Sequence, residues 1–220
     1  MNKIKEFTNS ERDHYKDLYT DLILSIDNIS ELLDEDDYNS RFFIKKVHII
    51  KDYLDKLDDA DYKADKKDFF DFLKSDEKYK TEVLNYKSTI INDLKKLELC
   101  RKCKCLKCIS SCSFKKCLNC LPSYYVHNCN EMDNCITKGL NTITLYSNDE
   151  ERDVNFEPLG LLENLKENKY YIYLVENNNR NNQHILEYIK YLNGEVEYLP
   201  ITKEDLDKIY DSFVKLNCYE

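Results

Sequence analysis

The sequence predicts an α+β protein of three parts: an N-terminal antiparallel helical bundle, a central zinc-stabilised cysteine-rich knot, and a small C-terminal antiparallel β-sheet with a closing helix. Three observations predict this fold. Apolar residues recur at helical spacing before Cys100, and nine of the ten cysteines lie between Cys100 and Cys135. After Gly139 the apolar period shortens to two, which is typical of strands. The predicted domains span residues 1–99, 100–138 and 139–220.

The N-terminal block is predicted to be a bundle of three long helices and one short one. Its apolar side chains recur at steps of three and four, so each helix presents one apolar face. Thr8 and Glu11 stand at capping-box spacing and predict the start of the first helix. Amphipathic helices of this length bury a shared core when they pack antiparallel. The predicted helices span about 8–33, 39–57 and 76–99, with a short piece over 69–73.

The cysteines of the central segment have the spacing of metal ligands. Cys-x2-Cys pairs begin at Cys100, Cys105 and Cys117, and each pair lets two thiolates converge on one tetrahedral ion. The segment contains few aliphatic residues, so metal binding has to supply its folding free energy. The candidate metal ligands are Cys100, Cys103, Cys105, Cys108, Cys112, Cys117, Cys120, His127, Cys129 and Cys135.

These ten candidates allow several arrangements, of which we favour two closed tetrahedral Zn²⁺ sites. Three ions sharing bridging thiolates, an iron–sulfur cluster and disulfides are the alternatives. Thiolate-rich sites are typical of structural zinc, because catalytic zinc keeps an open position and favours histidine or carboxylate ligands. In the two-ion arrangement, one ion is bound by Cys100, Cys103, Cys117 and Cys120, and the second draws on the other six candidates.

Charge is distributed unevenly along the chain. The segment 100–138 has seven basic and two acidic residues, whereas both flanks are acidic and the whole chain carries −9. Basic side chains beside zinc-bound thiolates neutralise the sulfurs, although they also allow contact with nucleic-acid phosphates. We therefore predict a non-enzymatic zinc-binding adaptor or regulatory protein that binds a protein partner. A nucleic-acid-binding regulator is the alternative, and metal storage or redox chemistry of the thiolates is a third hypothesis.

Several function classes do not fit this composition. Gly139, Gly160 and Gly194 are isolated from one another, so neither a P-loop nor a dinucleotide-binding fingerprint can form. No apolar run approaches the ~18 residues that cross a bilayer, and the N-terminal residues lack the apolar stretch of a secretory signal. We therefore expect a cytoplasmic protein without membrane contact and without catalytic residues.

The C-terminal block alternates apolar and polar residues and predicts short strands followed by a helix. The residues from 177 to 183 are read as a polar loop, and Asn193-Gly194 as a two-residue hairpin turn. Thr202 and Asp205 predict the start of a last amphipathic helix that continues to Leu216. The predicted strands lie around 143–146, 154–156, 169–176, 184–192 (which would also fit a short helix) and 195–199, and 159–165 is a connection.

Three stretches of this block follow one another in a distinctive order: NTITLYSNDEERDVNFEPLGLLE, KYYIYLV and ILEYIKYLNGEVEYLPITKEDLDKIYDSF. In this order they resemble the YrzB-like family, a small acidic domain of unknown function in bacteria and their phages. The resemblance covers about 80 of the 220 residues. It implies a bacterial or phage origin and a non-enzymatic role. The Asn-rich loop departs from the family pattern, which also does not explain the helical block or the cysteine segment.

Overall fold

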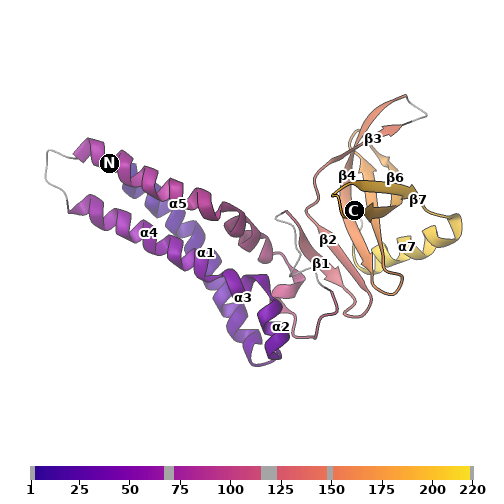
Figure 1. Ribbon diagram of the computed structural model, residues 1–220, viewed down its shortest axis with the longest axis horizontal. Coiled ribbons are helices and arrows are strands. Elements are labelled where there is room, and N and C mark those ends of the chain that lie inside the picture. Colours follow the sequence, from indigo (N-terminus) through magenta and orange to yellow (C-terminus); the bar gives the residue numbers. More distant parts are fainter. Residues whose placement is uncertain (1–2, 67–71, 115–122, 148–150, 219–220) are drawn as a thin grey trace. The chain divides into compact units, whose positions relative to one another are not determined.

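Two compact units, a helical unit and a sheet unit, make up the computed structural model (Figure 1). The helical unit comprises Met1–Arg101 and Leu106–Ile109, and the sheet unit comprises Lys102–Cys105 and Ser110–Glu220. Helices in the N-terminal part and an antiparallel sheet with a closing helix in the C-terminal part confirm the α+β class. The structure describes residues 3–66, 72–114, 123–147 and 151–218.

Three long helices of the helical unit, α1, α4 and α5, lie side by side (Figure 1). Their apolar side chains recur every three or four residues, so they fall on one face of each helix and pack inward. Leu18 and Leu22 of α1, Ile50 and Leu57 of α4 and Leu94 of α5 are fully buried there. The helices are α1 (Lys3–Ser30), α2 (Glu35–Ser40), α3 (Phe42–Lys46), α4 (His48–Asp65), α5 (Phe72–Cys100) and the 3₁₀ helix η1 (Lys104–Lys107).

The first helix begins earlier than its capping signal predicts. α1 starts at Lys3, so Thr8 lies inside the helix and is fully buried. Its hydroxyl is 3.1 Å from the Ile4 carbonyl oxygen and 2.6 Å from Oδ1 of Asp61 on α4. The prediction that Thr8 caps the helix is therefore wrong, because its hydroxyl instead connects two helices across the core.

The second predicted helix is divided in the structure. α3 and α4 are separated at Val47, and α4 continues to Asp65 instead of ending near Leu57. Ala60 and Ala64 extend the buried face of α4 over this last part, although their small side chains give a weak apolar signal in the sequence. The short helix predicted over 69–73 lies mostly outside the described residues, which resume at Phe72 with α5.

The sheet unit contains a seven-stranded antiparallel sheet in the order β1-β2-β4-β5-β6-β7, with β3 paired to β4. The long strand β4 organises it, because β5 pairs with one edge of β4 while β2 and β3 pair with the other edge. The strands are β1 (Tyr125–Cys129), β2 (Asn134–Lys138), β3 (Ile143–Ser147), β4 (Arg152–Asn164), β5 (Lys169–Glu176), β6 (Asn179–Lys190) and β7 (Val196–Pro200).

One face of the sheet packs against the helix α7 (Lys203–Lys215) (Figure 1). Ile136 and Tyr171 on this face contact Ile209 and Phe213 of the helix in one apolar core. The helix begins where the sequence predicts it, since Thr202 Oγ1 accepts a hydrogen bond from Asp205 N at 3.3 Å. The other face of the sheet has a separate core, whose buried members are Val154, Phe156, Leu161, Ile172 and Leu174.

The strands extend further than the alternation predicts. The segment 159–165, expected to be a connection, continues β4 to Asn164, because an irregularity between Pro158 and Gly160 accommodates both residues within the strand. β6 already begins at Asn179, so most of the predicted polar loop is strand. The hairpin after β6 is confirmed, but its loop has three residues between Tyr191 and Glu195, with Gly194 at φ 89°.

Candidate metal centre

The predicted metal ligands are distributed over both units. Cys100 is the last residue of α5 and is buried in the core of the helical unit. Cys108 belongs to the short stretch of this unit after η1, whereas Cys117 and Cys120 lie outside the described residues. The described candidates in the sheet unit are Cys103, Cys105, Cys112, His127, Cys129 and Cys135.

Four of these cysteines pack into one small apolar cluster of the sheet unit. Its buried centre consists of Phe114, Val126 and Cys135, against which three half-buried cysteines and Leu165 pack. Two of the cysteines follow α5 and two lie on β1 and β2, so segments that are distant in the sequence meet here. We call this group the cysteine cluster, and it comprises Cys103, Cys105, Phe114, Val126, Cys129, Cys135 and Leu165.

The β1–β2 hairpin places Cys129 directly opposite Cys135. The turn between the strands is held by Asn130, whose side-chain oxygen accepts hydrogen bonds from the N–H groups of Met132, Asp133 and Asn134 at 2.9–3.1 Å. The sequence predicts that this stretch belongs to the zinc knot and that the sheet starts after Gly139. In the structure the stretch is part of the sheet, because Val126, Ile136 and Thr137 are buried in it.

Lys104 fastens the segment after α5 onto β1. Its Nζ donates to Asn128 Oδ1 and to the carbonyl oxygen of Cys129, at 2.8 Å in each case. Asn128 Nδ2 in turn donates to the Leu216 carbonyl oxygen at 3.3 Å. One lysine and one asparagine thus connect two cysteine-bearing segments with the end of α7. Spacing along the sequence gave no signal for either contact.

His127 is directed toward the C-terminal segment. Its Nε2 lies 3.3 Å from the carbonyl oxygen of Asn217, and because a carbonyl only accepts, Nε2 carries the proton of the neutral ring. Burial lowers the pKa of His127 below its ordinary value, and nearby Lys138 lowers it further, although the hydrogen bond to Asn217 opposes both effects. In this arrangement only Nδ1 could bind a metal, and the role of His127 as a ligand stays a prediction.

A buried carboxylate that the sequence analysis did not single out lies next to the cysteine cluster. Glu163 on β4 is paired in register with Cys135 on β2 and is 8% exposed. The Tyr170 hydroxyl donates to Glu163 Oε1 at 3.1 Å. Burial, followed by the charge of Glu163, raises the pKa of Tyr170 to about 12. The sequence signal that could have identified Glu163 is an acidic residue in an apolar stretch, between Leu162 and Leu165.

In the ranges that the structure describes, no three Cys, His, Asp or Glu side chains are grouped closely enough to hold a metal ion. Cys117 and Cys120, which form one of the three Cys-x2-Cys pairs, are not among those residues. The zinc knot is therefore not shown, and its ligand pairing stays a prediction. What the structure does show is the convergence of four candidate thiols on Phe114 and Val126.

Among the described basic residues of the cysteine segment, Arg101 and Lys104 make contacts within the protein. Arg101 forms an ion pair with Asp21 of α1, and Lys104 donates to β1. Lys115 and Lys116 lie outside the described residues. The side chains of Arg101 and Lys104 are thus already engaged, which weakens the argument for a phosphate-binding surface on this segment.

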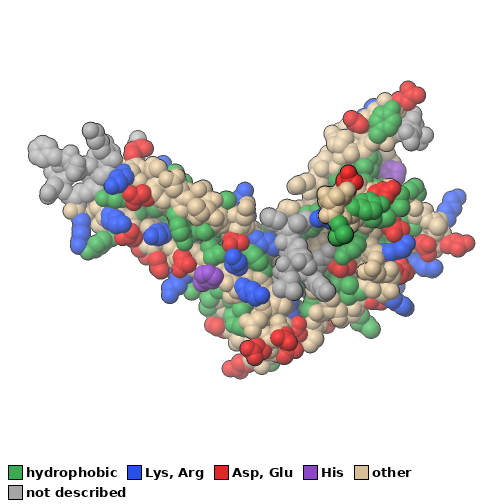
Figure 2. Space-filling model, viewed as in Figure 1, with side chains coloured by type: hydrophobic (Ala, Val, Ile, Leu, Met, Phe, Trp, Pro, Cys, Tyr) green, Lys and Arg blue, Asp and Glu red, His purple; other side chains and the backbone are tan. Residues whose placement is uncertain are grey.

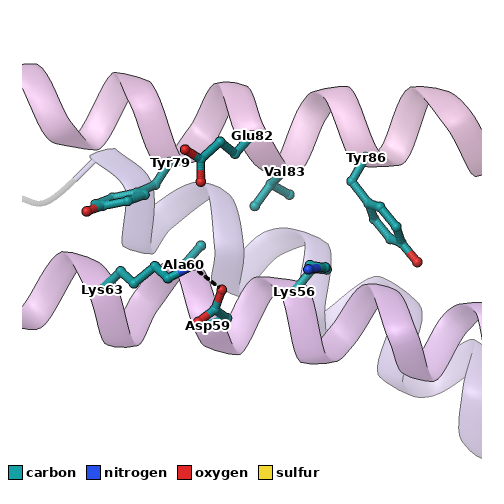
Figure 3. Close-up of a pocket in the computed structure, with 8 residues that line it drawn as sticks. All are labelled: Lys56, Asp59, Ala60, Lys63, Tyr79, Glu82, Val83 and Tyr86. Atoms are coloured by element: carbon teal, nitrogen blue, oxygen red, sulfur yellow. Dashed lines mark hydrogen bonds and ion pairs between the residues drawn. The ribbon is translucent and has the colours of Figure 1, made fainter.

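Two surface grooves among the described residues are candidates for ligand binding. A groove of about 160 Å³ lies between α4 and α5, where Lys63 pairs with Asp59 at 2.6 Å beside Tyr79 and Glu82 (Figure 3). A groove of about 280 Å³ on the sheet unit includes His184, whose ring centroid is 5.5 Å from that of Phe156. Both grooves are smaller than typical small-molecule sites, which enclose roughly 300–1,000 Å³.

Comparison with protein families, characterised proteins and solved structures gives no match to this chain. The resemblance of the C-terminal block to the YrzB-like family therefore stays a prediction. None of the helices within the described ranges is both long and apolar enough to span a bilayer.

Proposed function

We propose that this is a non-enzymatic zinc-binding adaptor or regulatory protein, in which zinc orders the cysteine segment and the acidic surfaces bind a protein partner. One observation carries the metal-binding part of the proposal. Cys103 and Cys105 pack in the same cluster as Cys129 and Cys135, although more than 20 residues separate the two pairs. Thiols from distant segments that lie together in this way are placed to share a metal ion.

Zinc is the ion that fits these residues best. Thiolates bind it at about 2.3 Å in closed tetrahedral sites, and such sites supply folding free energy to segments with small cores. Among the described residues, the buried centre of the cysteine cluster consists of Phe114, Val126 and Cys135, and bound zinc would add free energy of folding to this small core. We propose two zinc ions per chain, bound by ligands drawn from the ten sequence candidates.

The acidic surfaces are the proposed partner-binding regions. Asp34, Glu35, Asp36 and Asp37 gather at the start of α2, where Figure 2 shows a concentration of acidic side chains. Asp34 uses Oδ1 to cap α2 by accepting from Asp37 N at 2.8 Å. Asp34, Glu35 and Asp36 are exposed, and Asp37 is half-buried. Surface carboxylates of this density favour a partner that presents lysine and arginine side chains.

Metal content is the decisive measurement. Protein purified without added metal should contain two zinc ions per chain by elemental analysis, and titration with Co²⁺ should produce the charge-transfer absorption of cobalt–thiolate bonds. Cys135→Ser should lower the metal content, whereas the matched variant Cys218→Ser, which alters a buried cysteine outside the segment, should not. Metal-free protein whose cysteine segment is nevertheless well ordered would contradict the proposal.

The partner is tested separately with the zinc-loaded chain. A pull-down with salt steps should recover a basic protein, and neutralising Asp36 and Asp37 by substitution with asparagine should reduce its recovery. Binding to single- or double-stranded nucleic acid that strengthens steeply at low salt would instead favour the nucleic-acid-binding alternative, because phosphate contacts release counterions.

A further inference from the structure

The two cysteines of the β1–β2 hairpin, Cys129 and Cys135, lie directly opposite each other in the strand ladder. Beyond Cys129 and Cys135, toward the turn, Asn130 N donates to the Asn134 carbonyl oxygen at 3.0 Å. Hydrogen-bonded and non-hydrogen-bonded pairs alternate along an antiparallel ladder. Cys129 and Cys135 therefore form a non-hydrogen-bonded pair, the arrangement in which opposite residues approach most closely.

The main-chain contacts of Cys129 agree with this assignment. Its N–H donates to Asn128 Oδ1 at 3.0 Å, and its carbonyl oxygen accepts from Lys104 Nζ, so both groups have partners outside β2. In such pairs the α carbons are ~4.5 Å apart and both side chains project from one face of the sheet. Disulfides join residues whose α carbons are ~4.4–6.8 Å apart. The hairpin backbone thus already has the spacing that a disulfide needs.

The two thiols differ in their accessibility. Cys129 is half-buried on the edge strand β1, whereas Cys135 is 1% exposed. A small oxidant reaches Cys129 first, and the adjacent Cys135 is then placed to attack the modified sulfur. Pairs with one accessible and one neighbouring resolving thiol are typical of reversible thiol oxidation.

We propose that Cys129 and Cys135 form a reversible dithiol–disulfide site, which small-molecule disulfides such as oxidised glutathione convert to a cross-strand disulfide. The Cys129 thiolate attacks one sulfur of the small disulfide, forms a mixed disulfide and releases one small thiol. The Cys135 thiolate then attacks the Cys129 sulfur, closes the protein S–S bond and releases the second small thiol. The protein loses two electrons and two protons, and the small disulfide gains them.

This inference depends on the hairpin geometry and does not require the proposed zinc sites. It also goes beyond them, because the oxidised pair has no thiolate to offer a metal ion. Oxidation would then remove two of the ten candidate ligands at once.

The test uses the reduced, metal-stripped full chain. It is incubated with oxidised glutathione, blocked with N-ethylmaleimide and digested with trypsin, chymotrypsin and a glutamate-specific protease. Cleavage after Tyr125, Glu131 and Lys138 yields fragments 126–131 and 132–138, each with a single cysteine. The expected product is these two fragments joined by a disulfide that dithiothreitol cleaves. Cys129 joined chiefly to another cysteine, or both fragments recovered singly, would overturn the proposal.

Single variants test the order of the two steps. Cys129→Ser should lose the linked product, and Cys135→Ser should accumulate the glutathione adduct at Cys129, because the resolving thiol is missing. Cys218→Ser is the matched control and should keep the linked product, since Cys218 lies outside the hairpin. Circular dichroism establishes that each variant is folded. If Cys135→Ser does not fold, Cys129→Ser decides the order of the steps, because its buried Cys135 should stay free of glutathione. Absence of a glutathione adduct at Cys129 in Cys135→Ser, or loss of the linked product in Cys218→Ser, would overturn the proposal.

Discussion

At the scale of single residues, Gly160 and Cys218 show how closely the end of the chain is packed against β4. A methyl group at Gly160 would collide with Cys218 Sγ and approach Ile136 Cγ2 to 3.0 Å. Cys218 is fully buried, and its Sγ is 3.3 Å from the Leu159 carbonyl oxygen. The only cysteine outside the central segment thus has a packing role.

Gly160→Ala should therefore destabilise the protein by about 1–3 kcal/mol, the usual cost of overpacking a core. The measurement is urea unfolding followed by circular dichroism. The double variant Gly160→Ala with Cys218→Ala should recover part of this loss relative to Cys218→Ala alone, because the alanine side chain leaves room for the new methyl group. Equal losses in both backgrounds would show that the sulfur is not the obstacle.

The buried thiol of Cys218 also predicts a pH dependence. Burial raises its pKa to about 11, against a small opposing effect of Lys138. The folded state therefore retains this proton at pH values where the unfolded chain has lost it. The contribution of the Cys218 thiol to the free energy of unfolding is thus present below about pH 9 and is lost as the pH rises toward 11. Wild type should lose stability relative to Cys218→Ala over this interval, as measured by urea midpoints. A constant difference between the two proteins would contradict the assignment.

For single residues, the sequence was sufficient to predict the candidate thiols, but it did not predict which residues surround them. The cysteine spacing identified every candidate thiol, four of which the structure brings together. Lys104, Asn128 and Glu163 could not be found in the same way. Their positions depend on which strands become neighbours, and no local pattern records that pairing.

At the scale of elements, Lys104 connects the segment after α5 to β1 by hydrogen bonds, in addition to the packing of the cysteine cluster. Lys104 Nζ makes two hydrogen bonds of 2.8 Å, one of them to the side chain of Asn128 and the other to the main chain of Cys129. Hydrogen bonds from charged donors stabilise more than neutral ones. The half-buried lysine therefore holds Cys103 and Cys105 near the hairpin.

Lys104→Met should destabilise β1 by about 1–3 kcal/mol, because two charge-assisted hydrogen bonds are lost. Amide hydrogen exchange measured by mass spectrometry should become faster in peptides that cover 125–129, while exchange in α4 should be unchanged. Lys107→Met is the matched control, since Lys107 is an exposed residue of the same 3₁₀ helix. Equal exchange in the two variants would show that the contacts of Lys104 are unimportant.

Elements with a regular period were predicted well, and irregular ones were not. α7 begins at its predicted cap because Thr202 and Asp205 are only three residues apart in the sequence and interact locally. Only 154–156 of β4 was predicted as strand, and 159–165 was predicted as a connection; Pro158 and Gly160 are residues that usually interrupt strands. In the structure the pairing irregularity at these residues lets the strand continue, and such tertiary accommodation has no local signature.

At the scale of the whole molecule, the two units have independent apolar cores. The helical unit buries its own residues along α1, α4 and α5, and the sheet unit buries others on both faces of its sheet. Metal removal should consequently affect the cysteine segment and spare the helices.

Chelation should make the chain between Arg101 and Lys107 sensitive to trypsin while the helical circular dichroism signal is retained. The reason is that α1, α4 and α5 are held by apolar packing, whereas the cysteine cluster has a small core. Limited proteolysis with mass spectrometry locates the cleavage sites, and added zinc should restore protection. Cooperative loss of all helices on chelation would contradict this separation of the units.

The arrangement around β4 has a consequence for the continuity of the chain. β2 and β3 lie end to end along one edge of this strand, each with its own ladder of hydrogen bonds to it. If the backbone were cut between them, within residues 139–142, β2 and β3 would both remain hydrogen-bonded to β4. Two separately produced fragments, 1–140 and 141–220, should therefore reassociate into the intact fold.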